Sequence, residues 1–63
     1  GLKSFALDLG CLTFIDSAGL GMLLILHEEA EQKSIPMVVR RPRDDVKKSI
    51  ELAKINEIIT IDY

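Results

Sequence analysis

Residues 12–24, "LTFIDSAGLGMLL", set the architecture of the chain, because they pass from a loop into its longest apolar run. An Asp-Ser-Ala-Gly tetrad stands there between apolar residues. Serine is a favoured N-cap, since its hydroxyl oxygen accepts a hydrogen bond from a first-turn amide. We therefore predict that Ser17 caps a helix that ends near Lys33. Gly19 and Gly21 lack a Cβ atom, which allows tight helix packing or the close approach of another backbone.

The segment before this helix is predicted to be a strand followed by a loop. Residues 2–9, "LKSFALDL", mix alternation with apolar residues and end at a glycine, a pattern typical of a strand that runs into a loop. The loop spans residues 10–16, and we expect Cys11 to be buried in it. Its apolar side chains are expected to pack beneath it; they are Leu12, Phe14 and Ile15.

The segment after the first helix is predicted to add a strand, a second helix and a third strand. The second strand is 35–40, where Pro36 is tolerated only at the start or on an edge. Asp44 or Asp45 is expected to cap the second helix, which ends near Lys54. The remaining assignments are a buried helical stripe of Val46, Ile50 and Ala53, and a β-branched strand over 58–63. The order strand–helix–strand–helix–strand predicts an α/β fold with three parallel neighbouring strands.

Composition narrows the class of protein. The 63 residues are 48% hydrophobic and 29% charged, which is typical of one small globular domain. The net charge of −2 gives no overall attraction to nucleic acid or membranes. A single cysteine forms no internal disulfide, and no apolar run approaches the roughly 20 residues of a membrane span, so we expect a cytoplasmic domain. A chain this short buries only about 60% of its unfolded surface, so further strands are expected from preceding sequence or from a second copy in a homo-oligomer.

The sequence offers few candidates for catalysis or for metal binding. His27 is the only histidine, and no second metal ligand accompanies it; the glycines do not match a phosphate-binding loop. We predict no catalytic residue, no metal and no cofactor. A receiver-type aspartyl phosphate at Asp16 is disfavoured, because only Asp8 could join it and no lysine is placed for that chemistry.

A basic cluster lies downstream, and it consists of Arg40, Arg41, Arg43, Lys47 and Lys48. It fits an acidic partner, a phosphoryl group, anionic lipid or merely a solvated edge. No aromatic residues are interleaved with it, so direct nucleic-acid binding is not predicted.

The tetrad admits two interpretations from the residues alone. It is either a helix cap with packing glycines, or a serine held where another protein can reach it. The carboxyl ends of strands in open α/β sheets are where ligands bind, and a helix N-terminus favours a phosphate.

Residues 7–33 resemble the STAS domain, the module of anti-sigma factor antagonists and of sulfate-transporter cytoplasmic tails. The resemblance rests on Leu7-Asp8-Leu9 followed by "TFIDSAGLG" (13–21), with strand, helix and strand in the expected order downstream. It implies a STAS-like α/β fold with a mostly parallel sheet. It also implies that residues 1–63 are the C-terminal, larger part of a single STAS domain, whose opening strands and first helix would precede Gly1.

The resemblance further implies a non-enzymatic regulatory module of bacterial partner switching. The serine after the Asp, here Ser17, would be phosphorylated by an anti-sigma factor that is also a serine kinase, and a phosphatase would reset it. Unmodified antagonist binds the kinase and frees the sigma factor for transcription. Asp16 would help to present the hydroxyl. The implied partner-binding residues are Asp16, Ser17, Ala18, Gly19, Leu20, Gly21 and Met22.

Other family members imply an alternative role, as a transporter tail, a lipid-transport subunit or a sensory scaffold. The sequence also departs from the family pattern. Ala18 replaces a second hydroxyl residue, so Ser17 alone remains as acceptor, and Cys11 stands where many members have glycine. "AKIN" (53–56) lacks a glycine that often ends the last helix.

Overall fold

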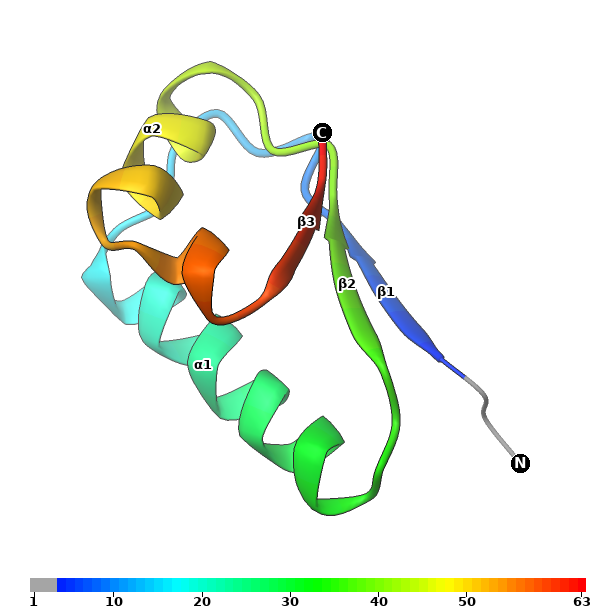
Figure 1. The fold of residues 1–63 in the computed structure, drawn as a ribbon. Coiled ribbons are helices and arrows are strands. Elements are labelled where there is room, and N and C mark those ends of the chain that lie inside the picture. The colour runs from blue at the N-terminus through cyan, green and yellow to red at the C-terminus, as the bar shows by residue number, and fades with distance from the viewer. Residues whose placement is uncertain (1–3) are drawn as a thin grey trace.

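The computed structural model describes residues 4–63 as a three-stranded sheet with helices on one face (Figure 1). The elements are β1 (Phe5–Asp8), α1 (Ser17–Gln32), β2 (Met37–Arg40), α2 (Asp44–Leu52), the 3₁₀ helix η1 (Ile55–Glu57) and β3 (Thr60–Asp62). The predicted order of strands and helices is confirmed. Residues 2 and 3 of the predicted first strand lie outside the described residues.

The strands are parallel and lie in the order β1-β2-β3, as the sequence predicts. Phe5 pairs with Met37 at one end of the β1–β2 ladder. At the carboxyl ends, Asp8 is in register with Arg40, and Arg40 with Asp62. Because each connection moves one strand further in the same direction with the same hand, α1 and α2 lie on the same face of the sheet (Figure 1).

The core lies between this face and the helices. β2 alternates, so that Met37 and Val39 are buried while Arg40 is exposed. The buried hydrophobic residues are Leu9, Leu23, Ala30, Met37, Val39, Val46, Ile50, Ile55 and Ile59. α2 contributes Val46 and Ile50, and the chain then closes the core with Ile55 of η1 and with Ile59. Ala53, predicted to be buried, is the exposed C-cap of α2.

The loop between β1 and α1 is more exposed than the sequence predicts. Cys11 and Leu12 are exposed, and Phe14 is 69% exposed, so the predictions that they are buried are wrong. Only Ile15 of the predicted set packs against the core. The loop runs over the surface, as connecting segments generally do, because their backbone polar groups need water.

The N-terminus of α2 also differs from the prediction. Arg43 is the N-cap residue, with an extended backbone and no capping hydrogen bond from its side chain. Asp44 and Asp45 lie in the first turn, where their charges favour the positive end of the helix dipole without capping it. Among residues 4–63, no helix is long and apolar enough to cross a membrane.

Candidate functional site

The start of α1 is fixed by Asp16, so the prediction that Ser17 is the N-cap is wrong. Asp16 has an extended backbone, and its Oδ1 accepts a hydrogen bond of 2.9 Å from the Gly19 amide. Its carbonyl accepts a second one, also of 2.9 Å, from the Leu20 amide. Asp is as good a cap as Ser, and the structure uses the earlier of the two adjacent residues.

Ser17 is consequently the first residue of α1 and is exposed. Within residues 4–63 its hydroxyl makes no hydrogen bond, whereas Oδ1 of the neighbouring Asp16 carboxylate is occupied by the cap. The first-turn amides and the positive end of the helix dipole lie beside the hydroxyl. This position gives an outside enzyme access to the oxygen, and it favours a negative group attached there.

The two glycines of the motif have different surroundings. A Cβ atom on Gly19 would lie 2.7 Å from Ile15 Cγ1, so this glycine is required by packing within the chain. A Cβ atom on Gly21 would meet nothing within 4 Å. Gly21 therefore leaves open space on the surface of α1.

The sequence-predicted partner-binding residues divide in the same way. Gly19 packs on Ile15, and Leu20 packs against the core. The exposed residues are Asp16, Ser17, Ala18 and Met22, and the half-buried Gly21 has open space beside it. Exposed apolar side chains extend this surface, because Met22 is 54% and Ile25 is 56% exposed. The exposed phenyl ring of Phe14 precedes it in the chain.

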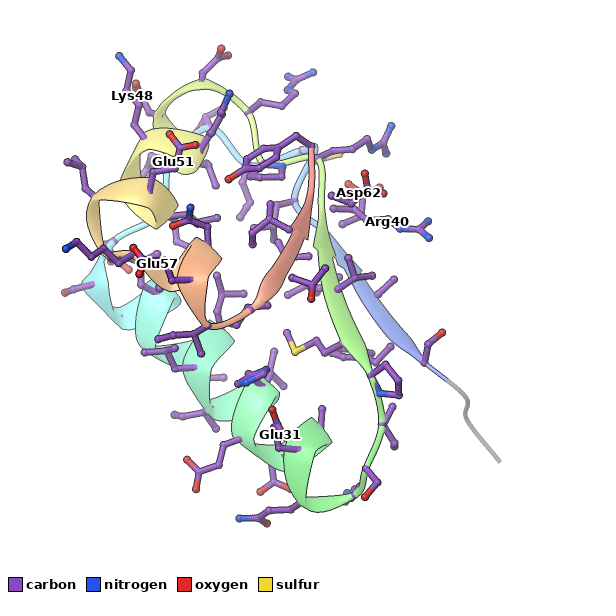
Figure 2. All side chains as sticks on the ribbon, viewed as in Figure 1. Glu31, Arg40, Lys48, Glu51, Glu57 and Asp62 are labelled. Carbon is purple, nitrogen blue, oxygen red and sulfur yellow. The ribbon has the colours of Figure 1, made fainter. Side chains whose placement is uncertain are left out.

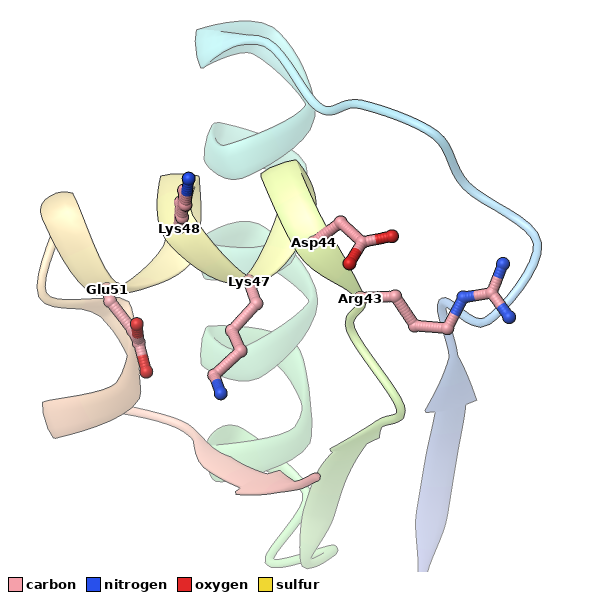
Figure 3. Close-up of a pocket in the computed structure, with 5 residues that line it drawn as sticks. All are labelled: Arg43, Asp44, Lys47, Lys48 and Glu51. Atoms are coloured by element: carbon pink, nitrogen blue, oxygen red, sulfur yellow. The ribbon is translucent and has the colours of Figure 1, made fainter.

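The predicted basic cluster is not a single positive patch. Arg40 Nε lies 3.9 Å from Asp62 Oδ2, and Arg41 forms an ion pair with Asp8 (Figure 2 labels Arg40 and Asp62). Lys47 Nζ lies 5.0 Å from the centre of the Tyr63 ring. Three of the five cations, Lys47 among them, line a shallow hollow of 780 Å³ together with two acids, and Arg43 extends away from the two lysines (Figure 3). The hollow is lined by Arg43, Asp44, Lys47, Lys48 and Glu51. The structure thus favours a solvated edge of mixed charge.

His27 is half-buried on α1. Its Nε2 lies 3.2 Å from Glu31 Oε1, one turn along the helix. The described part of the chain, 4–63, brings no three His, Cys, Asp or Glu side chains together in a way that could hold a metal ion.

Sequence reasoning missed the partner of Asp8. Asp8 Oδ1 accepts a hydrogen bond of 2.8 Å from the Gly10 amide, and Oδ2 pairs with Arg41 Nη2. The hydrogen bond from Arg41 is the largest cause of a lowered pKa of the Asp8 carboxyl, and the bond from the Gly10 amide lowers it further. The same bond to Asp8 is the largest cause of a raised pKa of Arg41. The sequence did carry a signal for this pair. An acid, Asp8, ends β1 and a base, Arg41, follows β2, and the parallel pairing of the two strands brings these positions together.

Comparison with known proteins identifies the class of domain. A family model of the STAS domain matches residues 1–63, and the chain therefore belongs to the STAS domain family. The parallel α/β fold described above agrees with this assignment.

One curated relative is "Sulfate transporter 2.2" of Arabidopsis thaliana. It is 34% identical over 59 residues, which cover 94% of this chain and 9% of the transporter. The chain thus spans about a tenth of the length of this relative. No solved structure matches the chain.

Proposed function

We propose that the chain is a non-enzymatic regulatory module that acts as an anti-sigma factor antagonist. The surface formed by residues 16–22 binds an anti-sigma factor that is also a serine kinase, and phosphorylation of Ser17 ends the binding. One observation carries the proposal: the Ser17 hydroxyl is exposed on the first residue of α1, directly after the Asp16 cap. A cytoplasmic location follows from this role.

The chemistry of the switch is local. The kinase transfers the γ-phosphoryl group of ATP to Ser17 Oγ, ADP leaves, and the hydroxyl proton passes to a base of the kinase. The phosphate adds about −1.5 to −2 charges and three acceptor oxygens. At a helix N-terminus the fold tolerates this charge, because free amides and the helix dipole stabilise it. A phosphatase removes the group by hydrolysis and restores the neutral hydroxyl.

The loss of binding follows from the position of the phosphate. It stands beside the Asp16 carboxylate and at the edge of an apolar surface that includes Met22. A partner that fits a neutral serine and the open space over Gly21 would have to desolvate two neighbouring negative groups. Affinity therefore falls without a change of fold.

The test is phosphorylation and binding in the same assay. The full-length protein is incubated with the purified anti-sigma kinase and ATP, and phosphate is located by mass spectrometry. We expect Ser17 to be labelled, Ser17→Ala to remain unlabelled but bound, and Ser17→Asp to lose binding. Ser34→Ala, at an exposed serine two residues beyond the C-terminal end of α1, is the control and should behave like the parent. Labelling of Ser17→Ala at the parental rate, or kinase binding by Ser17→Asp, contradicts the proposal.

A second candidate is a regulatory STAS module within an anion transporter. The identity of 34% with a sulfate transporter favours it. In that case the same surface contacts the transport domain. Crosslinking of the full-length protein, followed by mass spectrometry, separates the candidates. Crosslinks from residues 16–22 to a separate serine kinase support the first, and crosslinks to membrane-spanning peptides of the same polypeptide support the second.

A further inference from the structure

The loop that leads to Ser17 is tied to the sheet at its first end by a pair of charges. Asp8 is the last residue of β1, and Arg41 is the first residue after β2. Asp8 Oδ2 pairs with Arg41 Nη2, and Oδ1 lies 3.4 Å from Arg41 Nε, so the guanidinium meets both carboxylate oxygens. Oδ1 also accepts the Gly10 amide at 2.8 Å. We call this arrangement the Asp8–Arg41 clasp.

The local backbone is adapted to the clasp. A Cβ atom on Gly10 would lie 3.0 Å from Asp8 Oδ1 and 3.6 Å from the guanidinium, so a side chain there would crowd it. Arg41 has a φ of 53°, a left-handed conformation that is unusual for a residue other than glycine. Its amide donates a hydrogen bond of 2.7 Å to the Asp62 carbonyl, which holds the strained residue against β3.

Beside the clasp, the start of the loop is held by Leu9, which is buried in the core and whose amide donates a hydrogen bond of 2.8 Å to the Arg40 carbonyl. Leu12 donates a backbone hydrogen bond to Leu9, and Ile15 packs on the core, but residues 11–14 are exposed. At its second end the loop passes directly into the Asp16 cap and Ser17. Its path is therefore fixed near the start by the buried Leu9 and by the clasp, and at the end by the contact of Ile15 with Gly19.

We propose that Asp8 and Arg41 are positioning residues for Ser17: the clasp restrains the loop so that a kinase meets the hydroxyl in one orientation. This role rests on the proposed function of Ser17. The two residues touch neither Ser17 nor the transferred phosphoryl group. Without the clasp, the kinase must select a minor arrangement of the loop, which raises KM more than it lowers kcat.

The experiment measures loop protection and phosphorylation on the same full-length variants. Asp8→Asn keeps an oxygen that can accept the Gly10 amide but removes the negative charge of the clasp. Arg41→Gln removes its positive charge. We expect amide hydrogen exchange in peptides covering residues 9–16 to rise severalfold, and KM for Ser17 phosphorylation by the purified kinase to rise three- to tenfold. Arg41→Lys, which keeps the charge, should recover part of both. Asp62→Asn is the matched control, because Asp62 also faces an arginine at the carboxyl end of a strand, on β3.

The outcomes separate the clasp from general stability and from the proposed function. Parental exchange in residues 9–16 of Asp8→Asn overturns the clasp. So does an equal rise in β2 peptides, or the same effect in Asp62→Asn. Faster loop exchange with unchanged KM overturns the positioning role. If the parent is not phosphorylated, the proposed function and the positioning role both fail, while hydrogen exchange still decides whether the clasp orders the loop.

Discussion

At the scale of single residues, the two glycines of α1 differ in the space beside them. Gly19 is close to Ile15, whereas the space beside Gly21 is open. Glycine within a helix costs about 1 kcal/mol relative to alanine. At Gly19 that cost is offset by the contact with Ile15. At Gly21 nothing in the described residues offsets it, which is consistent with a partner that comes close there.

The stability of two alanine variants tests this difference. Gly21→Ala should stabilise the domain by about 0.5–1 kcal/mol, because it gains helix propensity without a clash. Gly19→Ala should destabilise it by about 1 kcal/mol, because displacing Ile15 costs more than the propensity gains. Urea unfolding followed by circular dichroism measures both. Equal effects of the two substitutions would contradict the conclusion that Gly19 is crowded and Gly21 is not.

Asp8 supplies a prediction about pH. The hydrogen bond from Arg41, followed by that from the Gly10 amide, lowers the pKa of the Asp8 carboxyl, and Arg40 adds a smaller effect of the same sign. A lowered pKa means that the stabilising contribution of the carboxylate is present at neutral pH and is lost as pH falls through the lowered pKa. We expect Arg41→Gln to shift the NMR titration midpoint of Asp8 upward, toward its ordinary value. An unchanged midpoint would show that Arg41 does not hold the carboxylate in solution.

At the scale of the elements, the sequence predicts the order of strands and helices but places their caps poorly. Strand and helix patterns are local, so the positions of α1, β2 and α2 follow from periodicity. Asp16 and Ser17 are adjacent residues of equal capping ability, so capping preference alone does not decide between them. No pattern in the loop distinguishes the half-buried Ile15 from the exposed Phe14.

The candidate site shows the same limit. The motif identifies Ser17, because its signal lies within a few consecutive residues. The clasp joins residues 33 positions apart, and it becomes visible only once β1 and β2 are known to be parallel neighbours. The sequence likewise does not show that Gly19 is crowded and Gly21 is not, because this difference depends on where Ile15 lies in space.

Capping gives a prediction for α1 as a whole. Asp16→Ala should lower the free energy of unfolding by about 1 kcal/mol, because the Gly19 amide loses its acceptor. Ser17→Ala should change it by less than about 0.5 kcal/mol, because Ser17 is exposed and does not cap. Thermal unfolding of the two variants in the same buffer makes the comparison. If Ser17→Ala lost more free energy of unfolding than Asp16→Ala, Ser17 and not Asp16 would be the cap.

At the scale of the whole molecule, the described chain has one core on one face of the sheet. The opposite face carries polar residues at the strand ends, where Asp8, Arg40 and Asp62 stand in register. Among residues 4–63, the helices form a single layer on the sheet, whereas parallel sheets are usually covered on both faces. The side chains that are buried most completely are Val39, Val46, Ile50 and Ile59, so burial is concentrated there.

A pair of substitutions on α2 tests that concentration. By the usual range per residue, 63 residues correspond to roughly 3–9 kcal/mol of stability. Ile50→Ala leaves a cavity beneath α2 and should cost about 2–5 kcal/mol, so that much of the population unfolds at 37 °C. Leu52→Ala, two residues further along and 85% exposed, should change stability by less than about 0.5 kcal/mol. Circular dichroism melts of the full-length variants measure both, and a stable Ile50→Ala protein would show that the layer of helices is not the main source of stability.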